Sequence, residues 1–235
     1  MPSFFLDRKY RLSRIWSNRE LKEFSSLFSG DIVNVSAWTD IDKEGKHYRD
    51  YFKNAASYTI TNYKTEAKGF QNNKNEIFLD LEDELPKELV EKFDVAFNHT
   101  VLEHIYEVHT AFKNLCLMSR DIVVLVVPFL QQMHGYYGDY WRFTPQTIKK
   151  MFEANSMSLL YLSFNNHKNS SVYIFSIASK DPSKWEDKIK NEFSFTEKQK
   201  PLDGFEPYIG CHAIQNTGYN LKRLLSRLLS KNKSS

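Results

Sequence analysis

The segment DIVVLVVP, residues 121–128, constrains the fold of this chain more than any other stretch. Its unbroken run of valine, leucine and isoleucine is typical of a strand that is buried on both faces of a sheet. Strands of this kind occur in parallel sheets, because the crossovers between parallel neighbours place helices over both faces. We therefore expect an α/β protein built on a parallel sheet.

Strand and helix patterns alternate before and after this segment. Strand patterns occur at residues 32–36, 57–63, 76–81, 93–98, 158–164 and 171–179, and helical patterns at 44–54, 84–92, 100–118 and after Thr144 and Pro145. The last two strands are joined by a short turn-rich segment, which favours an antiparallel hairpin. The fold prediction is a Rossmann-like, doubly wound, mostly parallel sheet of about seven strands with a C-terminal antiparallel hairpin.

Length and composition predict one main domain with two extensions. For 235 residues we expect an N-terminal extension with a helix at 1–28, the α/β domain at 29–180 and a C-terminal extension at 181–235. A net charge of +3 argues against nucleic acid as the main partner. Two cysteines, no signal-peptide pattern and no apolar run of about 20 residues favour the cytoplasm.

The C-terminal stretch NLKRLLSRLLSKNKSS has the pattern of a basic amphipathic helix. Its leucines fall on one helical face and its lysines and arginines elsewhere. Such a helix either packs on the domain, or it contacts a partner protein or the inner surface of a membrane as a peripheral element.

Polar residues follow several of the predicted strands. In an open parallel sheet, ligands bind outside the carboxyl ends of the strands, so these positions are the candidates for a site. The candidates are Ser36, Ala37, Asn62, Asp80, Asn98, His99 and the aromatic loop after Pro128.

Four blocks in this order resemble a known family. The blocks are LDLEDELP at 79–86, FDVAFNHTVLEHI at 93–105, IVVLVVP at 122–128 and DYWRFTPQTIKKMFEANS at 139–156. Together they are similar to class I S-adenosylmethionine-dependent methyltransferases, in particular to small bacterial ones associated with surface-glycan biosynthesis. The resemblance covers roughly residues 30–180 and implies S-adenosylmethionine as the cofactor.

The resemblance assigns cofactor roles to individual positions. Val35, Ser36 and Ala37 would lie by the methionine end, Asn62 by the ribose, Asp80 and Leu81 by the adenine, and Asn98 and His99 beside the methyl-donor sulfur. Two positions depart from the family: the first turn holds no glycine before Gly45, and Asn62 replaces the usual acid. Asp80 could instead cap the turn that follows it, and Asn98 and His99 could be turn residues that face solvent.

Three histidines are candidates for the general base that methyl transfer to a hydroxyl would use. We expect His104 in this role, or failing that His99 or His134, because the imidazole pKa lies near neutrality. The alternative for His104 is a surface histidine near a helix start. No metal site is expected from His99, His104 and His109, because a spacing of five residues places successive side chains about 140° off a common helical face.

The loop that ends in DYWRFTP combines aromatic rings with charged groups. Aromatic faces can stack on sugars, while aspartate and arginine can hold hydroxyl or anionic groups. The loop could equally fold over the sheet, with Trp141 and Phe143 buried and Asp139 paired with Arg142. The residues that we expect to bind the acceptor are Tyr137, Asp139, Tyr140, Trp141 and Arg142.

The leading hypothesis is therefore O-methylation of a sugar hydroxyl in a glycan or glycan precursor. The glycine-free first turn supports a rival hypothesis, in which the module is catalytically inactive and serves as a binding or scaffolding subunit of a glycan-assembly complex. A second rival is an enzyme of the same fold that uses another nucleotide ligand.

Overall fold

The structure is a computed structural model that describes residues 7–64, 69–134, 138–165, 167, 169–190 and 225. Seven strands form one sheet in the order β3-β2-β1-β4-β5-β7-β6. The strands are β1 (Ser29–Val35), β2 (Asn54–Asn62), β3 (Glu76–Phe78), β4 (Phe93–His99), β5 (Ser119–Leu130), β6 (Ser158–Phe164) and β7 (Val172–Ser179).

The pairing of the strands confirms the predicted fold. β1 pairs in parallel with β2 and β4, and β2–β3 and β4–β5 are also parallel. β7 is antiparallel to both β5 and β6, which gives the predicted hairpin at the end of the sheet. The apolar segment Ile122–Val127 lies within β5, between β4 and β7, where each of its side chains is at most 1% exposed.

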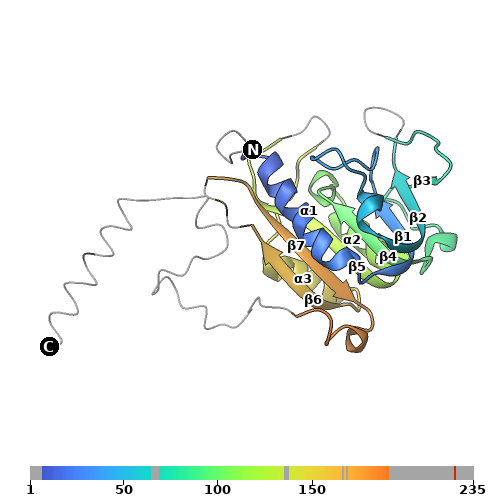
Figure 1. Ribbon diagram of the computed structural model, residues 1–235. Helices are drawn as coiled ribbons and strands as arrows, with labels where there is room; N and C mark the ends of the chain where they lie inside the picture. Colours follow the sequence, from blue (N-terminus) through green and yellow to red (C-terminus); the bar gives the residue numbers. More distant parts are fainter. Residues whose placement is uncertain are drawn as a thin grey trace.

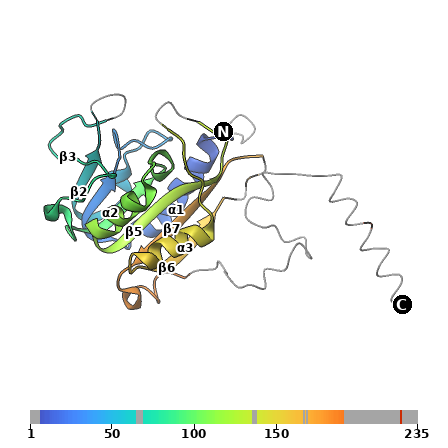
Figure 2. The same ribbon diagram turned by 180° about the vertical axis from the view of Figure 1, so that it is seen from behind.

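Helices cover both faces of the sheet. Helix α1 (Arg11–Ser25) lies on one face, and Figure 1 shows it in front of the strands. Helices α2 (Val108–Met118) and α3 (Pro145–Ala154) cover the opposite face, which Figure 2 shows from behind. Alternate β5 residues serve the two sides: Val124 and Val126 pack with Leu21 of α1, whereas Val123 and Leu125 pack with residues of α2 and α3.

The helix expected at residues 44–54 was a wrong prediction. The segment contains the short 3-10 helix η2 (Tyr48–Tyr51), and the loop that leads into it holds two buried aspartates, Asp40 and Asp42. The Asp42 carboxylate accepts the backbone N–H groups of Glu44 and Lys46 at 2.7 and 2.9 Å. Because the side-chain carboxylate provides these amides with hydrogen-bond acceptors, the segment does not need a helix to satisfy them, and it forms a loop despite its helical pattern.

Two other predicted helices are shorter than expected. Residues 84–92 contain the 3-10 helix η3 (Lys87–Leu89), and residues 100–118 divide into the 3-10 helix η4 (Leu102–His104) and α2. The division arises because the backbone carbonyl of Glu103 accepts the amide of Tyr140 at 2.7 Å, while the amide of Glu107 donates to Glu82. The predicted N-cap of α3 is confirmed, since Thr144 Oγ1 accepts the Thr147 amide.

The C-terminal helix that the sequence predicts lies outside the described residues, apart from Leu225, which is helical and half-exposed. In the part of the chain that is described, no helix is long and apolar enough to cross a membrane.

Truncating Phe97 tests how far the first face depends on β4. Its ring is fully buried and its centroid lies 5.2 Å from that of Tyr48 and 5.7 Å from that of Phe52. We expect Phe97→Ala to lower the free energy of unfolding by about 3–5 kcal/mol, as measured by urea denaturation. The control Phe78→Ala removes a ring that is 52% exposed and should cost far less. Equal losses would contradict this account of the core.

Candidate functional site

The loop after β1 replaces the expected glycine-rich turn with left-handed non-glycine residues. Ser36, Trp38 and Asp40 have φ values of 59°, 53° and 59°, in the region that glycine adopts most readily. Asp40 lies between Asn34 and Tyr58, whose side chains donate to its Oδ1 at 2.8 and 2.7 Å. By accepting these two hydrogen bonds, the buried carboxylate of Asp40 stabilises a left-handed turn that would form more readily with glycine.

The backbone amides of this loop are used within the chain. The amide of Ser36 donates to Thr61 Oγ1 at 3.1 Å, that of Ala37 to the Thr61 carbonyl at 3.1 Å, and that of Trp38 to Asn62 Oδ1 at 2.6 Å. A row of amides at this position could otherwise hold an anionic group. The loop therefore does not rebuild a cradle from these three amides.

Asn62, at the end of β2, is a structural residue in this arrangement. Its side chain is buried, and its Nδ2 donates to the Trp38 carbonyl at 3.0 Å and to Glu76 Oε1 at 2.5 Å. Burial raises the pKa of Glu76, but hydrogen bonds from Asn62 and from the amides of Asn73 and Gln71 outweigh it, so the pKa is lowered. These contacts explain why an amide stands where the resemblance implies an acid.

The next strand ends supply polar groups of another kind. Asp80 follows β3, and its Oδ1 accepts the amide of Glu82 at 2.9 Å, which is the turn cap that was considered as an alternative. Leu81 is buried beside it. At the end of β4, Asn98 donates to the carbonyl of Val35 at 3.0 Å. Its own Oδ1 is buried and has no hydrogen-bond donor among the described residues, which leaves an acceptor at the centre of this edge.

A second polar group lies just beyond β4, on η4. His104 Nδ1 is 2.6 Å from the Gly138 carbonyl, so Nδ1 carries the proton and Nε2 carries the lone pair of the neutral ring. Nε2 lies 3.8 Å from Glu103 Oε1. Burial lowers the pKa of His104, which keeps the imidazole neutral at pH 7. A neutral ring with a fixed tautomer can accept a proton at Nε2.

Glu103 is the buried acid of this group. Its side chain is fully buried, and both carboxylate oxygens have no hydrogen-bond partner among the described residues. Burial raises the pKa of Glu103 to about 7, against the opposing charges of Arg14 and Arg142. Glu103 was not among the predicted site residues, although it is next to His104 in the block FDVAFNHTVLEHI. Arg14 carries no comparable signal, since it comes from α1, far away in the sequence.

The loop after β5 adds the third histidine and an ion pair. Arg142 binds Asp139 through two contacts, at 2.5 and 2.8 Å, which lowers the pKa of Asp139 to about 2. Asp139 also accepts the backbone amide of His134 at 2.7 Å. The ring centroid of His134 lies 4.9 Å from that of His104. The alternative prediction that Asp139 pairs with Arg142 is therefore confirmed, and the contact of Asp139 with the His134 amide brings His134 to the site.

His99 does not fit the role of a base. It is the last residue of β4, and its Nε2 lies 2.8 Å from Ser17 Oγ while its Nδ1 lies 3.2 Å from Thr100 Oγ1. Burial and the charge of Arg14 lower its pKa well below the usual value. His99 thus fastens β4 to α1, and the solvent-facing turn that was its alternative is also not observed.

The aromatic residues of the loop are divided between core and surface. Phe143 is buried, but Trp141 and Tyr140 are 36% and 53% exposed. The indole N–H of Trp141 donates to the carbonyl of Tyr106, and the Tyr106 and Tyr140 rings form an edge contact with centroids 5.4 Å apart. Tyr137 lies outside the described residues. Two exposed rings are therefore available to a ligand at this end of the sheet.

Glu103, His104 and His134 must also be weighed as a metal site. One ligand atom from each lies within 4.8 Å of the others, a grouping that could hold an ion. His134 comes from a different loop, so the spacing argument for the other histidines does not cover it. However, Arg14 and Arg142 both act on Glu103 electrostatically, and they would repel a divalent cation. The absence of a metal stays our prediction.

Comparisons with known proteins support the fold. No protein-family model matches the sequence, and no curated protein matches it. A solved complex of the Haloferax volcanii Trm112 methyltransferase activator and a protein assigned as a methyltransferase matches at TM-score 0.50 and 8% identity, over 70% of this chain and 89% of that one. This likeness shows the Rossmann-like fold of methyltransferases.

Two further solved structures are similar at slightly lower scores. The Synechocystis magnesium protoporphyrin IX methyltransferase with bound S-adenosylmethionine matches at TM-score 0.48 and 12% identity, over 73% of this chain and 80% of that one. A Bacillus halodurans protein assigned as a methyltransferase matches at TM-score 0.49 and 10% identity, over 69% and 97%.

Restoring the acid at position 62 tests the structural role of the amide. In Asn62→Asp a carboxylate oxygen would face Glu76 and the Trp38 carbonyl, where Nδ2 now donates. We expect a loss of about 1–3 kcal/mol in the free energy of unfolding at pH 7, and a smaller loss at pH 4, where a protonated carboxyl can donate again. Urea denaturation at both pH values measures this.

The matched control is Asn72→Asp, which adds the same charge at an exposed position of the β2–β3 connection. This variant should unfold like the natural protein. A stable Asn62→Asp that equals the control would contradict the structural role.

Proposed function

We propose that this chain is an S-adenosylmethionine-dependent methyltransferase that O-methylates a sugar hydroxyl of a glycan or glycan precursor. The fold of methyltransferases supports the reaction class. The single observation that carries the proposal is the fixed tautomer of His104, whose Nε2 is held as a proton acceptor beside Glu103 at the carboxyl end of β4.

Residues at the strand ends could contact the cofactor at its adenine and at its sulfonium. Asp80 and Leu81 would hold the adenine, and Asn98, whose buried Oδ1 has no donor among the described residues, would stand by the sulfonium with Val35. The loop amides of Ser36 and Ala37 are occupied, and so is the Asn62 side chain. The methionine and ribose would therefore be held differently from the family pattern.

The chain's own residues would handle the acceptor and its proton. The cofactor, when bound, supplies an electrophilic methyl group. Tyr140, Trp141 and Tyr137 would stack on the sugar, while the Asp139–Arg142 pair keeps their loop in place. His104 Nε2 would take the hydroxyl proton, and Glu103 at 3.8 Å would stabilise the imidazolium. His134 is the second candidate for the base, and His99 is dropped because of its contacts with Ser17 and Thr100.

The rival is a module that has lost catalysis and acts as a binding or scaffolding subunit of a glycan-assembly complex. The occupied amides of the first loop favour it, because they remove donors that a cofactor could use. We expect the peripheral contact of the C-terminal helix, with a membrane or a protein, to serve either function.

Titration calorimetry with S-adenosylmethionine and S-adenosylhomocysteine separates the two. We expect saturable binding that is lost in Asp80→Ala, because the variant lacks the carboxylate at the adenine position. The control Glu88→Gln changes an exposed acid of η3 and should bind normally. Absence of heat and of a thermal shift at millimolar ligand would support the scaffold instead.

Replacing His104 tests the base. Asn can still donate to the Gly138 carbonyl but cannot accept the hydroxyl proton, so His104→Asn should lower kcat about 10²–10⁴-fold and leave cofactor affinity unchanged. Since the pKa of His104 is lowered from 6.5, kcat/KM of the natural protein should hold at neutral pH and fall as the pH drops below 6.5, where the ring becomes protonated.

Charges from several elements set this pH profile. His134, Asp139 and Arg14 all act on the His104 ring. Glu103, whose pKa is raised to about 7, has its Oε1 3.8 Å from His104 Nε2, close enough for the two titrations to influence one another. Glu103→Gln should therefore simplify the acidic limb of the profile. The control His109→Asn changes an exposed residue of α2 and should be neutral. A profile that stays flat at every acidic pH at which the protein remains folded would remove His104 as the base.

A further inference from the structure

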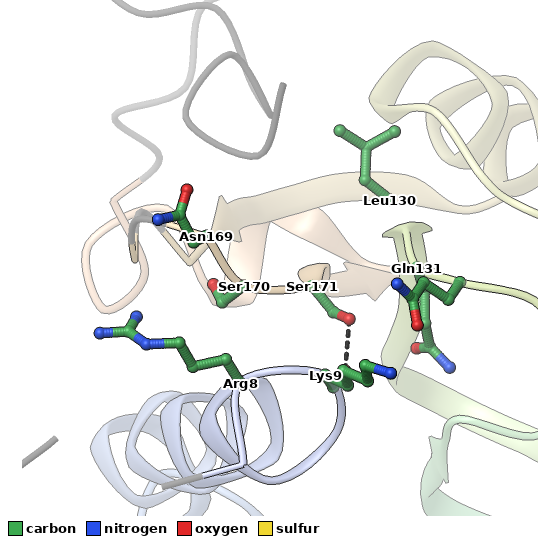
Figure 3. Close-up of a pocket in the computed structure, with 8 residues that line it drawn as sticks. Arg8, Lys9, Leu130, Gln131, Asn169, Ser170 and Ser171 are labelled. Atoms are coloured by element: carbon green, nitrogen blue, oxygen red, sulfur yellow. Dashed lines mark hydrogen bonds between the residues drawn. The ribbon is translucent and has the colours of Figure 1, made fainter. Parts of the chain in front are cut away.

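A cavity of about 420 Å³ lies at the end of β5, and none of its lining residues is one that we propose for the cofactor. Its walls come from the segment before α1, the end of β5 and the start of β7 (Figure 3). The residues that matter here are Arg8, Lys9, Gln131, Gln132, Ser170 and Ser171. Its volume falls within the usual range of about 300–1,000 Å³ for small-molecule sites.

The lining of this cavity is positively charged. Arg8 and Lys9 are the charged residues in its walls, and the lining contains no acid. Most of the other lining groups are amides and hydroxyls, which can donate hydrogen bonds. In Figure 3 the Arg8 side chain extends towards Asn169, while the Lys9 ammonium lies on the side of Gln131. A ligand in this space would therefore meet a cation at each end, which favours an anion.

Hydrogen bonds fix the backbone of the two residues that carry these positive charges. Ser171 donates its amide to the Arg8 carbonyl at 3.0 Å and its hydroxyl to the Lys9 carbonyl. The Ser13 hydroxyl on α1 in turn donates to the Ser171 carbonyl at 2.6 Å. The Lys9 amide also donates to Asp7 Oδ1 at 2.8 Å. These hydrogen bonds hold the backbone of Arg8 and Lys9 against the residue that precedes β7, and so fix the place from which the two charged side chains start.

One wall of the cavity contacts a histidine that neighbours the proposed base. Gln131, one of its walls, has its Nε2 2.9 Å from His134 Nδ1, and the ring of Tyr10 lies 5.3 Å from that of His134. His134 in turn contacts His104, with ring centroids 4.9 Å apart. A molecule that is anchored by Arg8 and Lys9 would extend past His134 towards Nε2 of His104.

We propose that this cavity binds the phosphate of the methyl acceptor. The acceptor is then a sugar phosphate ester or diphosphate, and not a neutral glycan. Arginine binds phosphate through its planar fork and lysine adds a point charge, which together suit a phosphate or diphosphate group. The inference rests on the proposed function, because it takes the group beside His104 to be a methyl acceptor.

Binding without the cofactor tests the proposal independently of activity. The probes are a hexose 1-phosphate, a nucleoside diphosphate hexose, the free hexose, and a hexose phosphate on a short polyprenyl chain in neutral detergent micelles. We expect at least one phosphate-bearing probe to bind and the free hexose not to bind, as measured by calorimetry. Soluble probes that bind would identify a soluble precursor, and binding of the polyprenyl probe alone would identify a lipid-carried one.

The variant Arg8→Gln/Lys9→Gln should lower the affinity for the phosphate-bearing probe at least about ten-fold, and the remaining affinity should depend less on salt. The control Lys150→Gln removes a positive charge from a lysine on α3 whose side chain is 82% exposed, and it should bind like the natural protein. Circular dichroism and thermal melting check that the double variant is folded.

Three outcomes would overturn the proposal: no binding of any phosphate probe, equal binding of the free hexose, or unchanged affinity in a folded double variant. Titration with S-adenosylmethionine is a separate measurement. Cofactor binding without phosphate binding would remove this inference alone. Phosphate binding without cofactor binding would remove the proposed methyl transfer and leave the cavity as a site for a sugar phosphate that is not a methyl acceptor.

Discussion

The two-sided burial of β5 is the constraint on which the rest of this structure depends. The side chains of Ile122–Val127 alternate between the layer with α1 and the layer with α2 and α3, and none of them reaches solvent appreciably. A strand of this kind cannot lie at the edge of a sheet, so β4 and β7 must flank it. The position of the candidate site then follows, because the carboxyl ends of β4 and β5 carry Glu103, His104 and His134 to the same edge.

The site is divided into two halves with different character. On the β1–β2 side, polar groups satisfy one another: Asn62 holds Trp38, and the loop amides donate to Thr61 and Asn62. On the β4–β5 side, a buried carboxylate has no hydrogen-bond partner among the described residues, and the rings of His104 and His134 form an edge contact. Satisfied groups stabilise a fold, whereas buried groups without partners are costly and are typical of places where a ligand binds.

Local sequence patterns predicted the strands and the sheet well, because the strand signal in β5 and β7 depends on apolar runs that few other structures could bury. They predicted the helices less well. At residues 44–54 the acceptors Asp40 and Asp42 captured amides that the helical pattern required, and at Glu103 a carbonyl was taken by Tyr140. Both competing hydrogen bonds involve a side chain or a residue far away in the sequence, and hydrophobic periodicity carries no information about either.

Contacts between residues far apart in the sequence also limited the prediction of the candidate site. His104 could be selected because imidazole chemistry is visible in the residue type, and the resemblance pointed to its block. The burial of Glu103 and the approach of Arg14 and His134 depend on α1 and on the loop after β5, which meet β4 only in three dimensions. The contact of His99 with Ser17 could not be predicted for the same reason, because Ser17 lies on α1.

The Gly138 carbonyl that orients His104 belongs to the same loop as Tyr140 and Trp141, and the amides of those two residues donate to the Glu103 carbonyl. Loop and base are therefore one mechanical unit. A substitution that displaces Tyr140 or Trp141 would therefore also disturb the Gly138 carbonyl, and with it the contact that places the proton of the His104 ring on Nδ1.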